Sequence, residues 1–162
     1  MGDPGDVIEL TPSERLVLVT TTVESNGELL AMEAHYGPSG RPPPEHYHPR
    51  QEERFTGVSG TVTARVAGVE RTIGPGDQLT IPAGVKHSFW NAGGEEAVLR
   101  WEVRPALRTE RMFEELAAAG SMLRAAFVVP RYREEFHLSS APQRTLLDLL
   151  APGARLMGIA RP

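Results

Sequence analysis

The sequence predicts a mostly β protein with a helical extension at its C-terminal end, and three observations support this prediction. Short runs rich in β-branched residues recur between residues 15 and 103, separated by glycine, proline or asparagine. After Arg104-Pro105 the β-branched residues thin out, and alanine, leucine, glutamate and arginine follow with helical spacing. The chain has 162 residues, which is the size of one ordinary domain with a core of its own. We therefore expect a β domain over residues 1–104 and a helical extension over residues 105–162.

Two antiparallel strands are expected at the beginning of the β domain. Residues 15–24 are rich in β-branched side chains, and residues 28–36 alternate between two faces. The intervening Ser25-Asn26-Gly27 is a turn signal, so a tight loop should join the two strands.

Further short strands are expected in the second half of the β domain, separated by turn residues. They fall at residues 61–66, 70–73, 78–81 and 97–103. Regularly spaced short strands of this kind are typical of a β-sandwich or a β-barrel.

The extension should contain at least two helices. Met112, Phe113 and Leu116 share one face of a helix over residues 109–119, and Gly120 is placed to end it. A second helix should begin at the capping-box pattern of residues 140–143 and include the leucines between 146 and 150. These helices pack either on the β domain or on the second subunit of a homodimer.

Composition and charge exclude several classes of protein. The net charge of −4, with basic residues scattered among acidic ones, argues against binding of nucleic acid or of a membrane surface. No apolar stretch is long enough to span a membrane, and the acidic N-terminus does not resemble a secretory signal, so a cytoplasmic location is expected. Because the chain has no cysteine, a metal would bind through nitrogen and oxygen atoms. The expected partner is a small molecule.

Histidine and glutamate are concentrated in two strings that glycine and proline frame. His46 and His48 form a His-x-His pattern, which on a strand points both imidazoles to the same face. Glu53 follows after four residues, on what should be the neighbouring strand, where its carboxylate can join the two nitrogens. His87 must come from a third strand. Together the four side chains predict a mononuclear metal site between strands.

The two strings resemble the paired motifs of the cupin superfamily, and every fixed position of those motifs is filled. The first motif, G-x5-H-x-H-x(3,4)-E-x6-G, matches Gly40, His46, His48, Glu53 and Gly60. The second motif, G-x5-P-x-G-x2-H-x3-N, matches Gly76, Pro82, Gly84, His87 and Asn91. The resemblance covers about residues 27–103 and is strongest to small single-domain bacterial cupins with a helical C-terminal extension.

This resemblance implies an antiparallel jelly-roll (cupin) β-barrel with a metal inside, held by His46, His48, Glu53 and His87. Imidazoles and one carboxylate suit divalent Fe, Mn, Ni, Co, Cu or Zn, and they leave coordination positions for water, dioxygen or substrate. Glu52 is an alternative carboxylate because the motif permits a gap of three residues. We prefer Glu53, which also satisfies the spacing to Gly60. A barrel that kept the motif without binding metal is the other possibility.

Three functions are compatible with such a site. The leading hypothesis is a metal-dependent enzyme acting on a small molecule, with dioxygenase-type chemistry favoured. A Lewis-acid isomerase or lyase would use the same site without redox chemistry. A non-catalytic module that binds or senses a small ligand is the third, and the absence of an evident helix-turn-helix weakens a transcriptional version of it.

Other residues near the motifs have simpler expected roles. Phe55, Phe89, Leu99, Trp101 and Val103 share the inward parity of their strands and should form core or line the site. By the same parity argument, Met32 and Tyr36 either reach the cavity or simply pack in the core, whereas Asn91 is expected to act in a turn. Arg41 and Arg50 are expected to form solvated salt bridges, and His35 and His137 do not fit the metal spacing.

Overall fold

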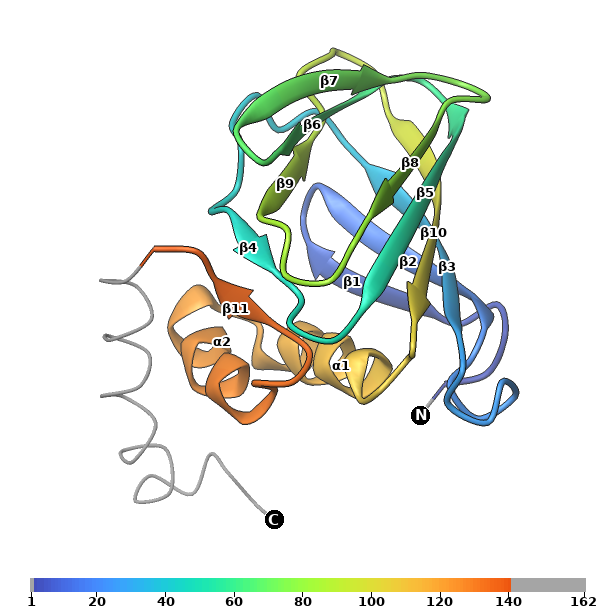
Figure 1. The fold of residues 1–162 in the computed structure, drawn as a ribbon, viewed down its shortest axis with the longest axis vertical. Helices are drawn as coiled ribbons and strands as arrows, with labels where there is room; N and C mark the ends of the chain where they lie inside the picture. Colours follow the sequence, from blue (N-terminus) through green and yellow to red (C-terminus); the bar gives the residue numbers. More distant parts are fainter. Residues whose placement is uncertain (1, 141–162) are drawn as a thin grey trace.

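The strands of the protein form two antiparallel sheets that face each other (Figure 1). The structure is a computed structural model, and it describes residues 2–140. The larger sheet has the strand order β1-β2-β3-β10-β5-β8, and the smaller one has the order β11-β4-β9-β6-β7. In the larger sheet the strands are β1 (Val7–Thr11), β2 (Glu14–Thr20), β3 (Leu30–Tyr36), β10 (Ala97–Arg104), β5 (Glu52–Ser59) and β8 (Gln78–Ile81). In the smaller sheet they are β11 (His137–Leu138), β4 (His46–Tyr47), β9 (His87–Trp90), β6 (Val62–Val66) and β7 (Val69–Ile73).

The predicted antiparallel pairing of β2 with β3 forms, but β2 ends earlier than expected, and the connection over residues 21–29 is longer than the predicted tight loop. β2 ends at Thr20 because the next residues turn: the Glu24 carboxylate accepts a hydrogen bond from the Thr21 amide at 3.0 Å. Asn26 and Gly27 both have positive φ, which glycine adopts without strain and asparagine tolerates. β1, which pairs with β2, was not anticipated from the sequence.

Alternation of side chains along the strands places the hydrophobic core between the two sheets. Phe55 on β5 and Phe89 on β9 belong to different sheets, and their ring centroids lie 4.2 Å apart. The inward positions of β2, β3, β10 and the smaller sheet are almost all apolar and fully buried: Leu16, Leu18, Leu30, Met32, Ala34, Leu99, Val103, Val62 and Ala64. The interior between the sheets is therefore a packed apolar volume, and any polar group inside it requires a specific partner.

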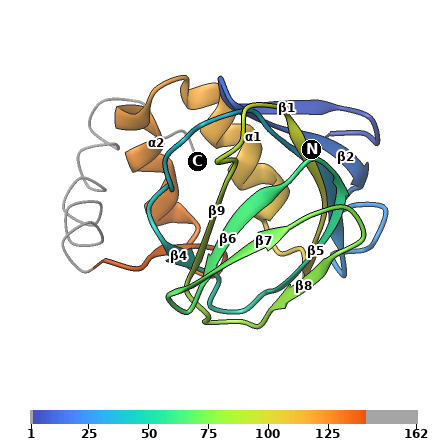
Figure 2. The same ribbon diagram turned by 90° about the horizontal axis from the view of Figure 1, so that it is seen from above.

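The extension after β10 begins with the predicted helix. α1 (Thr109–Ala119) has the expected boundaries, and Gly120 ends it in the left-handed conformation. Met112 and Phe113 are buried, and the Phe113 ring lies 5.4 Å from that of Trp101 on β10. Figure 2 shows α1 and α2 together at one side of the sheets. Because its apolar face packs on the strands, α1 is part of the same core as the sheets.

The rest of the extension departs from the expectation of helices alone. α2 (Met122–Val128) is followed by a short 3-10 helix, Val129–Arg131, and the chain then returns to the smaller sheet as strand β11. The helix expected after residue 140 lies outside the described residues. Within residues 2–140, no helix is sufficiently long and apolar to cross a membrane.

Candidate metal centre

Backbone pairing brings the first and last histidines of the two motifs together. His46 on β4 and His87 on β9 are directly opposite each other in the smaller sheet, and their ring centroids lie 4.4 Å apart. His48 follows β4, and its ring centroid lies 5.1 Å from that of His46 and 5.3 Å from that of His87. One ligand atom from each of the three histidines lies within 4.8 Å of the others, so the cluster could hold a metal ion.

The predicted carboxylate reaches this cluster from the opposite sheet. Glu53 lies on β5, between β10 and β8, whereas we expected it on the strand next to the His-x-His pattern. That expectation was wrong because the residues after His48 cross from the smaller sheet to the larger one. Glu53 Oε1 lies 3.2 Å from His48 Nε2, and Glu53 Oε2 lies 2.9 Å from His87 Nε2. The carboxylate therefore faces two of the imidazoles across the interior.

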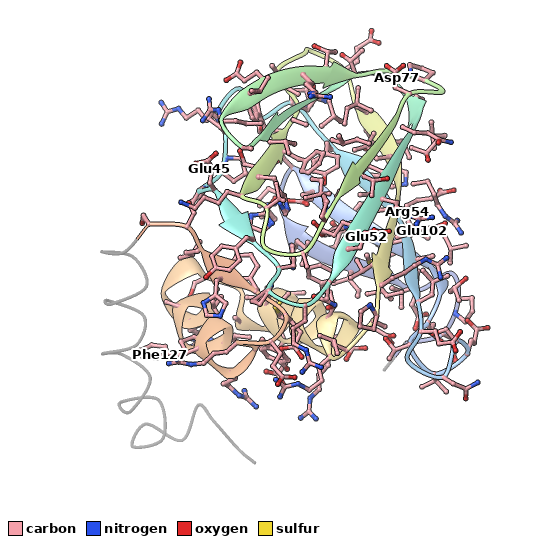
Figure 3. The ribbon with its side chains drawn as sticks, in the orientation of Figure 1. Glu45, Glu52, Arg54, Asp77, Glu102 and Phe127 are labelled. Carbon is pink, nitrogen blue, oxygen red and sulfur yellow. The ribbon has the colours of Figure 1, made fainter. Side chains whose placement is uncertain are left out.

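The alternative carboxylate, Glu52, points away from the histidines. It accepts a hydrogen bond from Arg54 at 2.8 Å, and its side chain is 38% exposed. Figure 3 shows Glu52 near Arg54 and Glu102 on the strands of the larger sheet. Glu53, by contrast, is fully buried. The strict alternation of side chains along β5 separates the two neighbours, and only Glu53 is turned towards the histidines.

Hydrogen bonds from outside the cluster orient two of the imidazoles. His48 Nδ1 lies 2.6 Å from the Glu135 carbonyl oxygen, and His87 Nδ1 lies 2.9 Å from that of Val85. A carbonyl oxygen can only accept, so each Nδ1 carries a proton that it donates. The Nε2 atoms of His48 and His87, which both approach Glu53, are then the atoms left to bind a metal.

Burial and mutual contact set the protonation of the four side chains. Burial lowers the pKa of His46 well below its usual value, and repulsion from His87 and His48 lowers it further. Burial also lowers the pKa of His48, which Glu53 opposes in part. Burial acts on His87 in the same direction, but the Glu53 carboxylate outweighs it and raises the pKa of His87. For Glu53, burial favours the neutral acid, but His48 and His87 overcome it and lower the pKa.

These shifts leave His46 and His48 as neutral imidazoles, the form that binds metals, while the contact with Glu53 favours a proton on His87. Binding of a metal would release that proton. The cluster therefore has a specific proton to exchange for a cation.

The donor atoms fit a first-row divalent metal in two respects. Two ligands bound at about 2.1 Å and at right angles lie about 3.0 Å apart, close to the 2.9 Å and 3.2 Å that separate Glu53 from His87 and His48. His48 Nε2 is also buried without a hydrogen-bond partner, since the Glu53 oxygen that it faces can only accept. A buried polar atom in that condition is costly, and coordination to a metal would satisfy it.

Trp101 donates a hydrogen bond to the Glu53 carboxylate, to the oxygen atom that also faces His48. Its Nε1–H donates to Glu53 Oε1 at 3.1 Å, and its ring packs between those of Phe55 and Phe113, each at 5.4 Å. The sequence placed Trp101 inside the domain by parity, but its hydrogen bond to Glu53 depends on the register between β10 and β5. That register is not written in the local sequence.

Other residues singled out in the sequence lie around the site, outside the set of four predicted ligands. Asn91 is a turn residue as expected, because its side chain bonds to the backbone of Tyr36, Gly93 and Glu95. Tyr36 is buried, and burial, with the charges of Glu14 and Glu53, raises its pKa well above the usual value. Arg50 forms an exposed ion pair with Glu134 at 3.0 Å, and the His137 ring stacks on that of Tyr47.

Comparison with known proteins gives a family match over the middle of the chain. A model of the cupin domain family matches residues 32–102, a segment that contains both motifs and all four predicted ligands. A protein of Arthrobotrys oligospora named as an oxidoreductase is 37% identical over 59 residues, which are 36% of this chain. The match spans only 23% of the length of that relative.

Solved structures share the fold at low sequence identity. KdgF from Halomonas sp. superposes with a TM-score of 0.52 and 20% identity over 61% of this chain and 86% of its own. A predicted oxalate decarboxylase from Thermotoga maritima superposes with a TM-score of 0.53 and 17% identity over 57% of this chain and 80% of its own. At these identities the likeness concerns the arrangement of the strands.

Proposed function

Because residues 32–102 form a cupin domain, we propose that this protein binds a divalent transition metal through His46, His48, Glu53 and His87 and acts on a small molecule. The observation that supports the proposal is the meeting of three imidazoles and one buried carboxylate at one point between the sheets. We propose dioxygenase-type oxidation as the reaction. The similarity to a protein named as an oxidoreductase is in keeping with that choice.

The surroundings of the four side chains suit such chemistry. A divalent metal, when bound, supplies open positions at which dioxygen and an oxidisable substrate can meet. The chain itself supplies an apolar wall of Phe55, Phe89 and Leu99, which keeps water from the interior. Trp101 fixes the orientation of Glu53. In this proposal the two sheets together form the jelly-roll barrel of the cupin family, with the metal between them.

Metal content tests the ligand set. The purified protein should hold about one metal per chain in elemental analysis, and His48→Ala should abolish that content because it removes a donor atom inside the cluster. His35→Ala is the matched control, since His35 instead contacts Arg15 and Glu96 at the surface. Equal metal content in wild type and His48→Ala would refute the assignment.

Oxygen consumption tests the reaction. The protein is reconstituted anaerobically with Fe(II) and mixed with oxygenated buffer and a panel of diketones, flavonols, catechols and thiols. A dioxygenase consumes one dioxygen per substrate and places both oxygen atoms in the product, which ¹⁸O₂ labelling detects by mass spectrometry. Turnover without oxygen uptake, supported equally by Zn(II), would instead indicate a Lewis-acid isomerase or lyase. Tight binding of one compound without turnover would indicate a binding or sensor module.

A further inference from the structure

The chain after the 3-10 helix returns to the candidate metal centre and forms strand β11 there, whereas the sequence predicted only helices in the extension. β11 pairs with β4 through the registers His137 with Tyr47 and Leu138 with His46. The Ser139 amide also donates to the Glu45 carbonyl oxygen at 2.8 Å. The described end of the chain therefore lies along the strand that contributes the first histidine.

Two contacts join this segment to the imidazoles themselves. The Phe136 ring stacks on His46, with a centroid distance of 4.8 Å and an interplanar angle of 25°. The Glu135 carbonyl oxygen accepts the hydrogen bond from His48 Nδ1 at 2.6 Å, which is shorter than the corresponding bond of His87 at 2.9 Å. One short segment thus covers one histidine and sets the tautomer of another.

The Glu135 backbone is held in place by its own side chain. The Glu135 carboxylate is buried, with 1% of the residue exposed. It accepts hydrogen bonds from Arg108 Nε at 2.9 Å and from Arg108 Nη2 at 3.1 Å. The Arg108 amide lies 3.3 Å from the same carboxylate, and Arg108 Nη2 also donates to the Arg131 carbonyl oxygen at 3.1 Å. A paired fork of this kind fixes direction as well as distance.

We propose that Arg108 and Glu135 are positioning residues of the metal centre: their ion pair holds the Glu135 carbonyl oxygen against His48 and so directs His48 Nε2 at the metal. The inference rests on the proposed metal site. Arg108 immediately precedes α1, so the pair also connects the helical extension to the ligands. Outer partners of this kind contribute about 10- to 100-fold to metal affinity.

The test compares Arg108→Met with Arg111→Met, which removes an arginine from the same helical region. Arg111 forms an exposed ion pair with Glu115 at 3.1 Å and has no contact with Glu135 among the described interactions. Metal affinity is measured by competition with a chromophoric chelator, well below the unfolding temperature of every variant. We expect Arg108→Met to weaken Co(II) binding by about 10-fold or more and to change the Co(II) absorption spectrum. Arg111→Met should do neither.

A second measurement needs no metal. Long-range ¹H–¹⁵N NMR of the metal-free protein should find the His48 proton on Nδ1 in the wild type and a mixture of tautomers in Arg108→Met. If Arg108→Met does not fold, Glu135→Gln should give the intermediate loss, because an amide oxygen can still accept from the guanidinium.

The two proposals fail in different ways. A wild type that binds no metal would refute the metal site and, with it, this inference. Wild-type binding that Arg108→Met matches in affinity, in Co(II) spectrum and in His48 tautomer would refute the positioning role and leave the metal site standing.

Discussion

The two tryptophans of the chain allow the hydrogen bond to Glu53 to be measured by one chemical change made at two places. Trp101 and Trp90 are each 7% exposed. Trp101 faces the interior and donates to Glu53 Oε1 at 3.1 Å. Trp90, one residue beyond the inward-facing Phe89, lies under the Arg65 guanidinium at 5.3 Å. Replacing each tryptophan by phenylalanine removes a similar volume, but only one replacement takes a donor from the carboxylate.

The expected magnitudes follow from these contacts. Trp101→Phe loses a hydrogen bond to a charged group, which stabilises the folded state by about 1.5–3 kcal/mol. Trp90→Phe weakens an interaction between a cation and an aromatic ring that contributes about 0.5–1 kcal/mol. Both variants also lose stability because phenylalanine fills less volume than tryptophan, and this loss largely cancels when the two variants are compared. Trp101→Phe should therefore reduce the free energy of unfolding by about 1–2 kcal/mol more than Trp90→Phe does.

Urea unfolding of the metal-free variants, followed by circular dichroism, measures this difference, and the chelator competition measures metal affinity. Because Trp101 orients Glu53, its loss should also weaken metal binding by about 10-fold, whereas Trp90→Phe should leave the affinity unchanged. Equal losses of stability together with equal metal affinities would show that the hydrogen bond does not orient the carboxylate.

Three further predictions concern stability outside the cluster. Burial raises the pKa of Glu14 to about 7, so the folded state binds a proton more tightly than the unfolded state. The contribution of Glu14 to stability should therefore fall as pH rises from about 4.5 to 7. Over that range the wild type should lose up to about 3 kcal/mol relative to Glu14→Gln, and parallel pH profiles of the two proteins would contradict this prediction. Gly57→Ala should destabilise the folded state by more than about 3 kcal/mol, because its new methyl group overlaps the Gly74 carbonyl. Gly94→Ala, whose methyl group would lie in open space, should be nearly neutral, and thermal unfolding of the two variants measures the difference. Gln51→Leu removes the side-chain donor that three acceptors near the start of α1 share, and it should reduce the free energy of unfolding by about 2–4 kcal/mol in urea unfolding.

Local sequence signals predicted the strands and the first helix well because the forces that form them act over few residues. The boundaries of α1 follow from apolar spacing and from a glycine that adopts the left-handed conformation. The turn before β3 was predicted from Asn26 and Gly27, which both adopt positive φ there. The two motifs predicted the match to the cupin domain family over residues 32–102, because their glycines and prolines mark turns at fixed distances from the histidines.

The arrangement of the candidate site needed the tertiary structure. Parity along β5 predicts that Glu52 and Glu53 point in opposite directions, but not which of them points inward. Packing of the two sheets decides that, and it also brings Glu53 to the histidines from across the core.

The sequence by itself determined which side chains could bind a metal, because a motif records the residue types and spacings that such a site requires. Only the tertiary structure decided what surrounds them: the Trp101 donor, the Phe136 ring and the Glu135 carbonyl oxygen. The physical reason is that these contacts join residues 48 to 90 positions apart. A main-chain carbonyl, which every residue has, leaves no signature in the sequence.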